Sequence, residues 1–404
     1  MKLRTLIFWP HLIAGAIAGV LILTMSVTGV ILTYERQLIA WSDSHLRSTP
    51  PAAGASRLEV EALLTQVRRE HPDLQVTGVT MGSDVDATAV VAAEGGNRHF
   101  DIYTGQLLGE SATGVRTFMS DMRVWHRYIG VVGDNRPIAK AISGWANVFF
   151  AFIVLSGLYL WFPRKWTWKH VRPVVWFKGG LRGKARDFNW HNAIGMWSAV
   201  PLFIVVVSAV PISFRWAGDA VYRAVGEQPP APAGRAGGAG GREGAAGARA
   251  GGDASRGGAR REPAALDGLN ALWTRAEQQV PDWRTINLRV PASDRAPVVF
   301  AIDKGDGGQP QHRSTLTLAR QTGEIVTYED FSSLTLGRRI RNVMRFAHTG
   351  EVLGIPGQTI AGLVSAGGVV LVWTGIALTL RRFSAWRARR RERPEAAATR
   401  DVAA

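Results

Sequence analysis

Four long stretches of the chain contain no Asp, Glu, Lys or Arg and are rich in Leu, Ile, Val, Ala and Phe. Each exceeds the roughly 20 residues that a helix needs to cross the hydrocarbon core of a bilayer. None shows the alternation of apolar and polar residues that is typical of a half-buried strand. The pattern predicts four transmembrane helices, within Thr5–Tyr34, Ala141–Pro163, Phe188–Phe214 and Val352–Leu380.

The segments that follow the first and third of these helices carry another pattern, which occurs twice. Ser56–Pro72 and Ala265–Pro281 each have the apolar spacing of an amphipathic helix and end at a proline. A strand-like run follows each helix, opening with Val76–Thr80 in one copy and Thr285–Val290 in the other. Each copy ends at a turn whose glycine suits the positive φ of a tight hairpin: Tyr103-Thr-Gly-Gln-Leu-Leu and Gln321-Thr-Gly-Glu-Ile-Val.

The order of helix, α+β module and helix therefore repeats, which indicates an internal duplication. The fold class predicted is a membrane all-α four-helix bundle with two small periplasmic α+β modules. Its expected parts are helix 1 (5–34), module 1 (35–120), a histidine segment with helix 2 (121–163), a basic loop (164–187), helix 3 (188–216), module 2 (217–345), a histidine segment with helix 4 (346–380) and a basic tail (381–404). Within module 2, the Gly/Ala/Arg-rich stretch 229–263 cannot bury a core and is interpreted as a flexible insertion.

The distribution of positive charge predicts the orientation in the membrane. The chain has a net charge of +16, and Lys and Arg concentrate in the loop 164–187 and in the tail that begins at Arg381. Short cytoplasmic loops carry such an excess, so both termini are expected in the cytoplasm of a bacterium and the two modules outside its inner membrane. Topology in the lipid bilayer accounts for the charge, and no nucleic-acid partner is expected. The chain has no Cys, which excludes disulfides, thiolate metal sites and covalent haem attachment.

Four of the nine histidines lie at the ends of predicted spans: His11, His126, His191 and His348. Ionisable groups at membrane depth are candidates for function, although a histidine at a span end also suits the interface. The duplication relates His11 to His191 and His126 to His348. Topology places the pair His11 and His191 near the cytoplasmic face and the pair His126 and His348 near the periplasmic face.

Glycines accompany three of these histidines four residues further on, at Gly15, Gly130 and Gly195. Positions i and i+4 share a helix face, so a glycine there leaves room for a flat ligand beside the imidazole, although close helix packing also uses glycine. Two histidine pairs in a bundle without Cys favour two noncovalent haem b groups, each with two axial imidazoles. Zinc or copper is the alternative, but it more often recruits carboxylate or Cys ligands as well.

Three arginines near the outer histidines are candidate partners for the haem propionates. Carboxylates of this kind pair with guanidinium groups, and Arg123, Arg127 and Arg345 lie within three residues of His126 or His348. The alternative is that these long side chains extend along apolar surface toward the interface.

Several motifs resemble the PepSY-associated transmembrane family of iron-regulated inner-membrane proteins, which includes haem-containing ferric-siderophore reductases. They are His11-Leu-Ile-Ala-Gly with Val27-Thr-Gly-Val and Tyr34-Glu35, Trp125-His-Arg-Tyr-Ile-Gly, Leu155-Ser-Gly-Leu-Tyr-Leu-Trp-Phe-Pro-Arg, and His191-Asn-Ala-Ile-Gly-Met-Trp. The two outer modules resemble PepSY domains. The resemblance covers nearly the whole chain outside 229–263 and the last dozen residues.

This resemblance implies a transmembrane ferric-chelate reductase. Electrons would pass from a cytoplasmic or quinol donor through the two haems to a periplasmic ferric siderophore or another ferric chelate. The alternative is a non-redox membrane-tethered protein whose PepSY modules bind or regulate a peptidase or transporter. A third possibility is that the bundle transports iron or its chelate. Four spans that already hold two haems leave little room for such a path.

Overall fold

The structure of the chain is a computed structural model that describes residues 3–163, 165–231, 265–291 and 293–401, with side chains as far as residue 390. It divides into two compact units. The membrane unit comprises Met1–Glu35, Thr117–Ala224 and Ile340–Ala404, and the sheet unit comprises Arg36–Arg116 and Val225–Arg339. Most of the insertion predicted at 229–263 lies outside the described residues.

Four helices of the membrane unit are long and apolar enough to cross a bilayer, within the described part of the chain. They are α1 (Leu3–Leu32), α5 (Arg136–Trp161), α7 (Gly183–Ser213) and the first half of α11 (Gly354–Asp401). Both α1 and α7 pack against α5 and α11. The sequence prediction of four membrane helices is confirmed.

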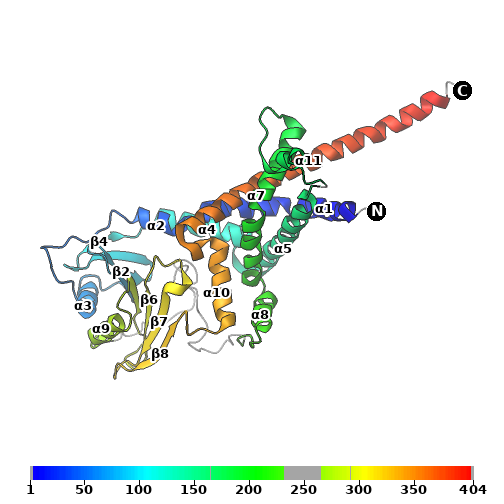
Figure 1. Cartoon of the computed structure of the whole chain (residues 1–404). Helices are drawn as coiled ribbons and strands as arrows, with labels where there is room; N and C mark the ends of the chain where they lie inside the picture. The colour runs from blue at the N-terminus through cyan, green and yellow to red at the C-terminus, as the bar shows by residue number, and fades with distance from the viewer. Residues whose placement is uncertain (1–2, 164, 232–264, 292, 402–404) are drawn as a thin grey trace. The chain divides into compact units, whose positions relative to one another are not determined.

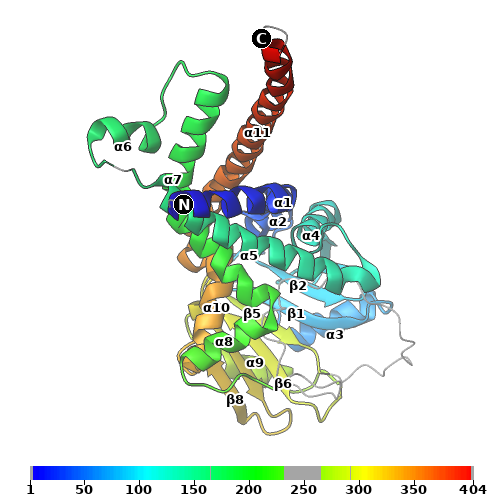
Figure 2. The same ribbon diagram turned by 90° about the vertical axis from the view of Figure 1, so that its right-hand side faces the viewer.

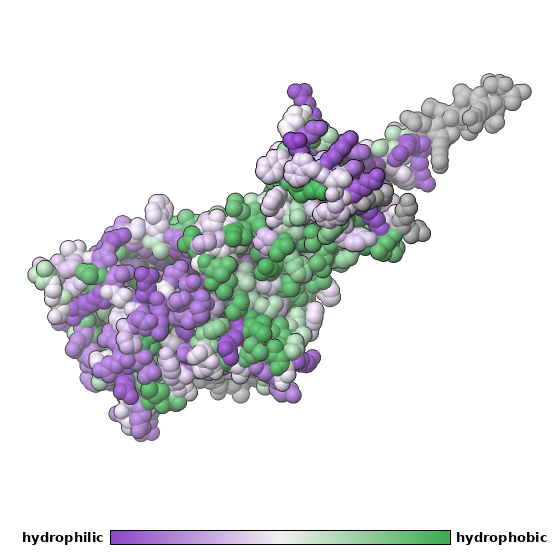
Figure 3. All heavy atoms as spheres, in the orientation of Figure 1, coloured by the Kyte–Doolittle hydropathy of each residue, from purple (hydrophilic) through white to green (hydrophobic). Residues whose placement is uncertain are grey.

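The outer surface of these helices is apolar, as expected for contact with lipid. Ile17, Val20, Val200 and Leu363 each expose more than three-fifths of their side chains, and Figure 3 shows a broad hydrophobic surface over the membrane unit. Inside, side chains from all four helices form a packed layer: Ala18, Ile22, Ala146, Phe150, Leu202, Val206 and Val364. The bundle is therefore apolar both on its outer surface and in its interior.

Shorter helices flank the spans. They are α4 (Thr113–Tyr128), α6 (Trp168–Val175), α8 (Arg215–Ala224) and α10 (Leu336–Thr349). Figure 2 shows α6 within the connection between α5 and α7. Left-handed glycines follow the last residues of α4 and α10, at Gly130 (φ 77°) and Gly350 (φ 77°), and a glycine in this conformation ends a helix. Each of these two helices is thereby separated from the span that follows it.

The sheet unit contains one antiparallel sheet of eight strands in the order β4-β3-β2-β1-β5-β6-β7-β8. The strands are β1 (Val76–Gly82), β2 (Thr88–Ala93), β3 (Gly96–Asp101), β4 (Leu107–Glu110), β5 (Thr285–Arg289), β6 (Val298–Asp303), β7 (Arg313–Leu318) and β8 (Ile325–Asp330). The helices are α2 (Glu35–Ser42), α3 (Val60–Glu70) and α9 (Leu269–Gln279). The turn glycines Gly105 and Gly323 have positive φ, as predicted.

The two predicted α+β modules are joined in this sheet by the pairing of β1 with β5. A separate four-stranded sheet would leave the edge of β1 unpaired, and exposed edges invite unwanted pairing. At the junction a Cβ on Gly78 would lie 2.9 Å from the main-chain oxygen of Leu288, so only glycine allows the strands to approach. The sequence pattern predicted both modules but not that they share one sheet.

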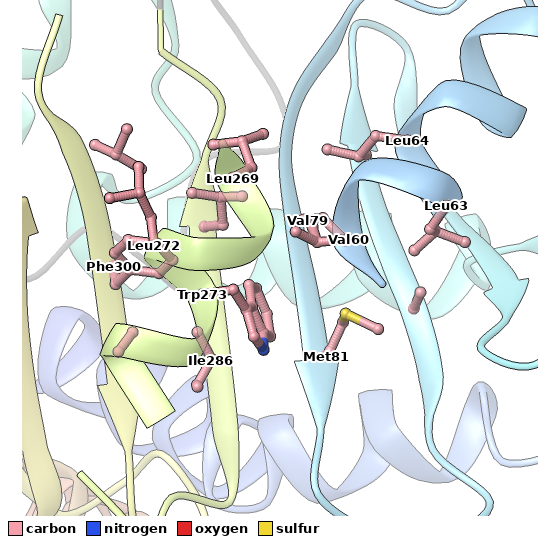
Figure 4. Packing of buried hydrophobic residues seen from close by; sticks show 14 of the residues in the cluster. Val60, Leu63, Leu64, Val79, Met81, Leu269, Leu272, Trp273, Ile286 and Phe300 are labelled. Carbon is pink, nitrogen blue, oxygen red and sulfur yellow. The ribbon is translucent and has the colours of Figure 1, made fainter. Parts of the chain in front are cut away.

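Helices α3 and α9 cover one face of the sheet side by side (Figure 1). Their apolar faces and the strands beneath form one core, in which Leu63, Leu272 and Phe300 are almost fully buried (Figure 4). The first turns of the two helices exchange hydrogen bonds: Glu61 N donates to Asn270 Oδ1 (3.0 Å), and Asn270 N donates to Glu61 Oε1 (2.8 Å). Helix N-termini leave such amide groups without partners, so this exchange holds the two repeats together.

A buried polar cluster in the sheet unit centres on His99 of β3. Its Nδ1 and Nε2 atoms hydrogen-bond with Thr88 Oγ1 (2.7 Å) and Ser111 Oγ (3.0 Å). The Asp43 carboxylate lies 3.6 Å from Nε2 and also pairs with Arg116. Burial is the largest influence and lowers the pKa of His99 below 6.5, although Asp43 acts to raise it. The folded unit therefore takes up a proton on this ring less readily than the unfolded chain does.

We expect the sheet unit to lose stability as pH falls below 6.5, the ordinary pKa of His99. The unfolded chain binds the proton in that range while the folded chain does not, so protonation favours unfolding until the lower folded pKa is reached. Urea unfolding midpoints of the full chain at several pH values measure this. His99→Gln should flatten the dependence, and His312→Gln, at a histidine of the same unit that is not among the groups acting on His99, should preserve it. An equal slope in all three proteins would contradict the assignment to His99.

Candidate functional site

The four histidines at the span ends all lie in the membrane unit. His11 and His191 lie inside the membrane helices α1 and α7, whereas His126 and His348 lie in the last turns of α4 and α10. His126 thus lies on a short helix that precedes the span α5.

Each histidine is held through its Nδ1 atom by a neighbouring helix. His11 meets Ser156 Oγ of α5 at 2.8 Å, and His191 meets Thr374 Oγ1 of α11 at 2.9 Å. His126 meets Thr28 Oγ1 of α1 at 3.0 Å. For His348 the partner is the main-chain oxygen of Val205 in α7, at 2.8 Å.

The direction of these hydrogen bonds follows from the partners. The Ser156 hydroxyl donates to Phe152 O (2.7 Å), the Thr28 hydroxyl to Thr24 O (2.7 Å) and the Thr374 hydroxyl to Val370 O (2.7 Å). A hydroxyl has one proton, so each of these oxygens accepts from the imidazole, and the carbonyl of Val205 can only accept.

In all four rings the proton therefore sits on Nδ1, and the Nε2 atom keeps its lone pair. A metal-binding histidine commonly has this arrangement, in which the second nitrogen donates to an outer partner that fixes the ring orientation. Each of the four imidazoles is therefore neutral and has a basic Nε2 atom that could coordinate a metal.

The rings lie in two pairs. The ring centres of His126 and His348 are 6.0 Å apart, with their planes inclined at 50°. His11 lies within electrostatic range of His191. These are the pairings that the duplication predicts, each with one histidine from each half of the chain.

The two pairs lie at different depths. At 1.5 Å per residue, the stretch of α1 from His11 to Thr28, which holds His126, spans roughly 25 Å. The stretch of α7 from His191 to Val205, which holds His348, spans roughly 21 Å. The hydrocarbon core is about 30 Å thick, so each pair lies toward one end of the bundle.

Three glycines face the histidine rings, and none was predicted from the sequence. A Cβ added to Gly157, Gly375 or Gly29 would lie 3.2, 3.5 or 3.6 Å from the Cε1 atom of His11, His191 or His126, respectively. Each glycine directly follows the hydroxyl residue that holds the same ring. A Ser-Gly or Thr-Gly dipeptide inside a span was thus the sequence signal for these positions. The hydroxyl accepts the Nδ1 proton of a histidine, and the glycine leaves space for the imidazole ring.

The glycines predicted from the sequence, Gly15, Gly130 and Gly195, differ in their surroundings from the three that face the histidine rings. A Cβ on Gly15 would meet nothing within 4 Å, and one on Gly195 would meet only Leu371, at 3.6 Å. Gly130 lies beyond the end of α4, so the argument that it shares a helix face with His126 does not hold. Its left-handed conformation is the physical reason for glycine there.

The three predicted arginines already have neighbours. Arg123 forms an ion pair with Glu35. The guanidinium of Arg127 lies 5.3 Å from the ring centre of Tyr128, and that of Arg345 lies 5.7 Å from the ring centre of Phe346. An anionic group that bound Arg123 would have to share it with the Glu35 carboxylate.

The donor set distinguishes between kinds of metal site. Among the described residues, no group of three or more His, Cys, Asp or Glu side chains could hold a metal ion. Structural zinc takes four protein ligands and catalytic zinc takes three. Two imidazoles without further protein ligands instead suit a metal that already has an equatorial ligand set.

These features define a class of protein: a four-span membrane protein that carries two pairs of oriented histidines and a separate unit built on an antiparallel sheet. The family described as PepSY-associated TM region matches residues 8–382, and the chain belongs to this family. The resemblance noted in the sequence is thereby confirmed. No curated protein matches the chain.

We expect Ser156→Ala to destabilise the membrane unit. The substitution leaves the Nδ1 proton of His11 without its acceptor, and an unsatisfied buried donor costs about 1–3 kcal/mol. Ser156→Thr, which keeps the hydroxyl as Thr374 does in the other half, should retain most of the stability. Thermal unfolding in detergent, followed by tryptophan fluorescence, measures both. Equal melting of Ser156→Ala and the unchanged protein would show that this contact contributes nothing.

Proposed function

We propose that the chain is a cytochrome of the bacterial inner membrane that holds two noncovalent haem b groups. In this proposal, His11 and His191 ligate the inner haem, and His126 and His348 ligate the outer one. The observation that carries the proposal is the orientation of the four rings, each anchored through Nδ1 with Nε2 left as a ligand.

The spacing of the outer pair supports haem. A metal–imidazole bond is about 2 Å long, and the ring centre lies about 1 Å beyond the nitrogen. Two imidazoles on opposite sides of one iron therefore have ring centres about 6 Å apart, and the observed separation is 6.0 Å. The porphyrin supplies the four equatorial nitrogens that the chain does not.

The activity we propose is the reduction of a ferric chelate, in particular a ferric siderophore, on the periplasmic side. Haem supplies one-electron transfer, and a ferrous ion is held less tightly than a ferric ion by oxygen-rich chelators. The hydrogen bonds to Nδ1 keep the four imidazole ligands in place. The apolar layer around Ile22 and Phe150 excludes water between the inner and the outer histidine pair. We infer that the two halves of the chain arose by duplication, since each contributes one ligand to each site.

The first test is the haem content of histidine variants. The purified protein should contain about two extractable haems, and His11→Ala or His126→Ala should each leave about one. Removal of His126 should deplete the outer haem and abolish chelate reduction, while the inner haem is still reduced from the cytoplasmic side. His45→Ala, at an exposed histidine of the sheet unit, is the control that should keep both haems.

Two results would overturn the assignment. A colourless protein would favour a non-redox protein that binds or regulates a peptidase or transporter. If His11→Ala and His126→Ala deplete the same spectroscopic haem and spare the other, the pairing is wrong.

The second test compares two glycines of the inner site. Alanine at Gly157 brings its Cβ to 3.2 Å from His11, a tight contact, whereas alanine at Gly375 lies at 3.5 Å from His191, an ordinary one. Overpacking costs about 1–3 kcal/mol, so Gly157→Ala should weaken haem binding by roughly tenfold or more while Gly375→Ala stays close to the unchanged protein. Haem titration of the apoprotein measures the difference, and a larger loss for Gly375→Ala would contradict the geometry.

A further inference from the structure

A pocket of about 450 Å³ lies in the membrane unit, against the part of α7 that carries His191. Its walls come from the connection before α7, from α7 itself and from α11. Small-molecule sites have volumes of about 300–1,000 Å³ and mainly apolar and aromatic walls. The residues that shape this pocket are Phe177, Lys178, Arg186, Trp190, Ile194 and Val370.

The wall formed by the connection is fixed by a buried asparagine. Asn189 donates from Nδ2 to Pro173 O (2.7 Å) and Trp176 O (3.0 Å), and its Oδ1 accepts from Lys178 N (3.0 Å). Trp197 Nε1 also donates to Val175 O (2.9 Å). The loop that carries Phe177 and Lys178 is therefore held in place against α7.

The pocket is adjacent to His191 through two of its walls. Trp190 directly precedes His191, and Ile194 lies one turn further along the same helix. On the opposite wall, Val370 O accepts the hydroxyl proton of Thr374, the residue that holds Nδ1 of His191. A molecule in this pocket would lie next to the inner haem of the proposed cytochrome.

Asp187 compensates part of the positive charge at the opening of the pocket. Arg186 pairs with Asp187 at 2.9 Å, and Asp187 also pairs with Arg381 at 2.9 Å. Lys178 also lines the pocket and takes part in neither of these ion pairs. The charge alone therefore does not separate a phosphate from a neutral polar group, and the shape of the walls decides the class of ligand.

The walls themselves suit a flat ring. The rings of Phe177 and Trp190 meet at 89° with their centres 6.5 Å apart, which provides an aromatic corner. Both side chains are substantially exposed on the surface of the bundle, so a ligand with a long apolar tail could leave the tail in the bilayer. The ammonium of Lys178 supplies a donor for an oxygen on the ring.

We propose that this pocket binds the ring of a lipid-soluble quinol, which donates the electrons. The inference rests on the proposed function and names its donor. Oxidation of one quinol to a quinone would release two protons to water at the opening and two electrons. The inner ferric haem would accept these electrons one at a time, passing the first to the outer haem before it takes the second. By the positive-inside rule this opening faces the cytoplasm.

The proposal is tested with a substitution that fills the pocket without straining the backbone. Gly179 lines it, has no left-handed φ, and a Cβ there would meet nothing within 4 Å, so Gly179→Leu adds a side chain at little cost. Gly114→Leu is the matched control, because Gly114 of α4 is equally unobstructed and lies outside the pocket. Phe177→Ala, which removes one aromatic wall at an exposed position, is a second variant.

Two measurements on the full-length protein are made for each variant. The first is photolabelling by an azidoquinone without any reductant, mapped to peptides; it does not depend on haem. The second is the anaerobic rate of haem reduction by decylubiquinol, with dithionite reduction and haem content measured alongside. We expect labelling within 177–194 that Gly179→Leu and Phe177→Ala lose, and a quinol rate at least roughly tenfold lower, with dithionite reduction unchanged.

Three outcomes would overturn the quinol site. The first is labelling elsewhere in the chain, and the second is reduction of the haem by quinol at the unchanged rate in Gly179→Leu. The third is co-purification of phospholipid, rather than quinone, with the unchanged protein and its loss from Gly179→Leu. Absence of haem from the unchanged protein would instead defeat the cytochrome proposal, and the photolabelling result would still decide whether the pocket binds quinone.

Discussion

The hydrogen bond from Nδ1 of a histidine to an oxygen on the next helix is the interaction on which the membrane unit depends. It occurs at His11, His126, His191 and His348, and each time it crosses from one helix to another. In a medium without water the proton on Nδ1 needs an acceptor, so the bond fixes both the tautomer and the rotation of the ring. It leaves Nε2 as the only basic nitrogen, and the chemistry of the site follows from that choice.

The two halves of the chain solve this requirement in similar but unequal ways. Counted from the histidine on the same helix, Ser208–Ala209 of α7 corresponds to Thr28–Gly29 of α1. His126 uses the Thr28 hydroxyl, whereas His348 uses the main-chain oxygen of Val205, to which Ser208 also donates (3.0 Å). The inner pair is held by two hydroxyl groups and the outer pair by one hydroxyl and one carbonyl. A main-chain acceptor cannot be removed by substitution, which makes that anchor the least sensitive to mutation.

The sequence predicted the spans, the strands that begin the two repeats and the histidines, because each leaves a local pattern. Apolar runs without charge identified the helices, and alternation identified β1 and β5. Ser156, Thr374 and Val205 could not be identified in this way, since their roles depend on which helix packs beside which. Gly157 and Gly375 were missed for the same reason. The i+4 spacing that singled out Gly130 assumed that the helix of His126 continues to residue 130, whereas α4 ends at Tyr128. The joining of two modules into one sheet is likewise a tertiary fact, decided at β1 and β5, which are far apart in the chain.

That junction has a consequence for biosynthesis. When the first repeat leaves the membrane, β1 is an open sheet edge, and its partner β5 has not yet been made. Two further spans, α5 and α7, must be inserted before the second repeat is delivered to the same side. Pairings between segments so distant in sequence form slowly, and an unpaired edge is prone to aggregation during the delay. Correct assembly of the sheet therefore requires β1 to avoid other partners until β5 has been synthesised and delivered.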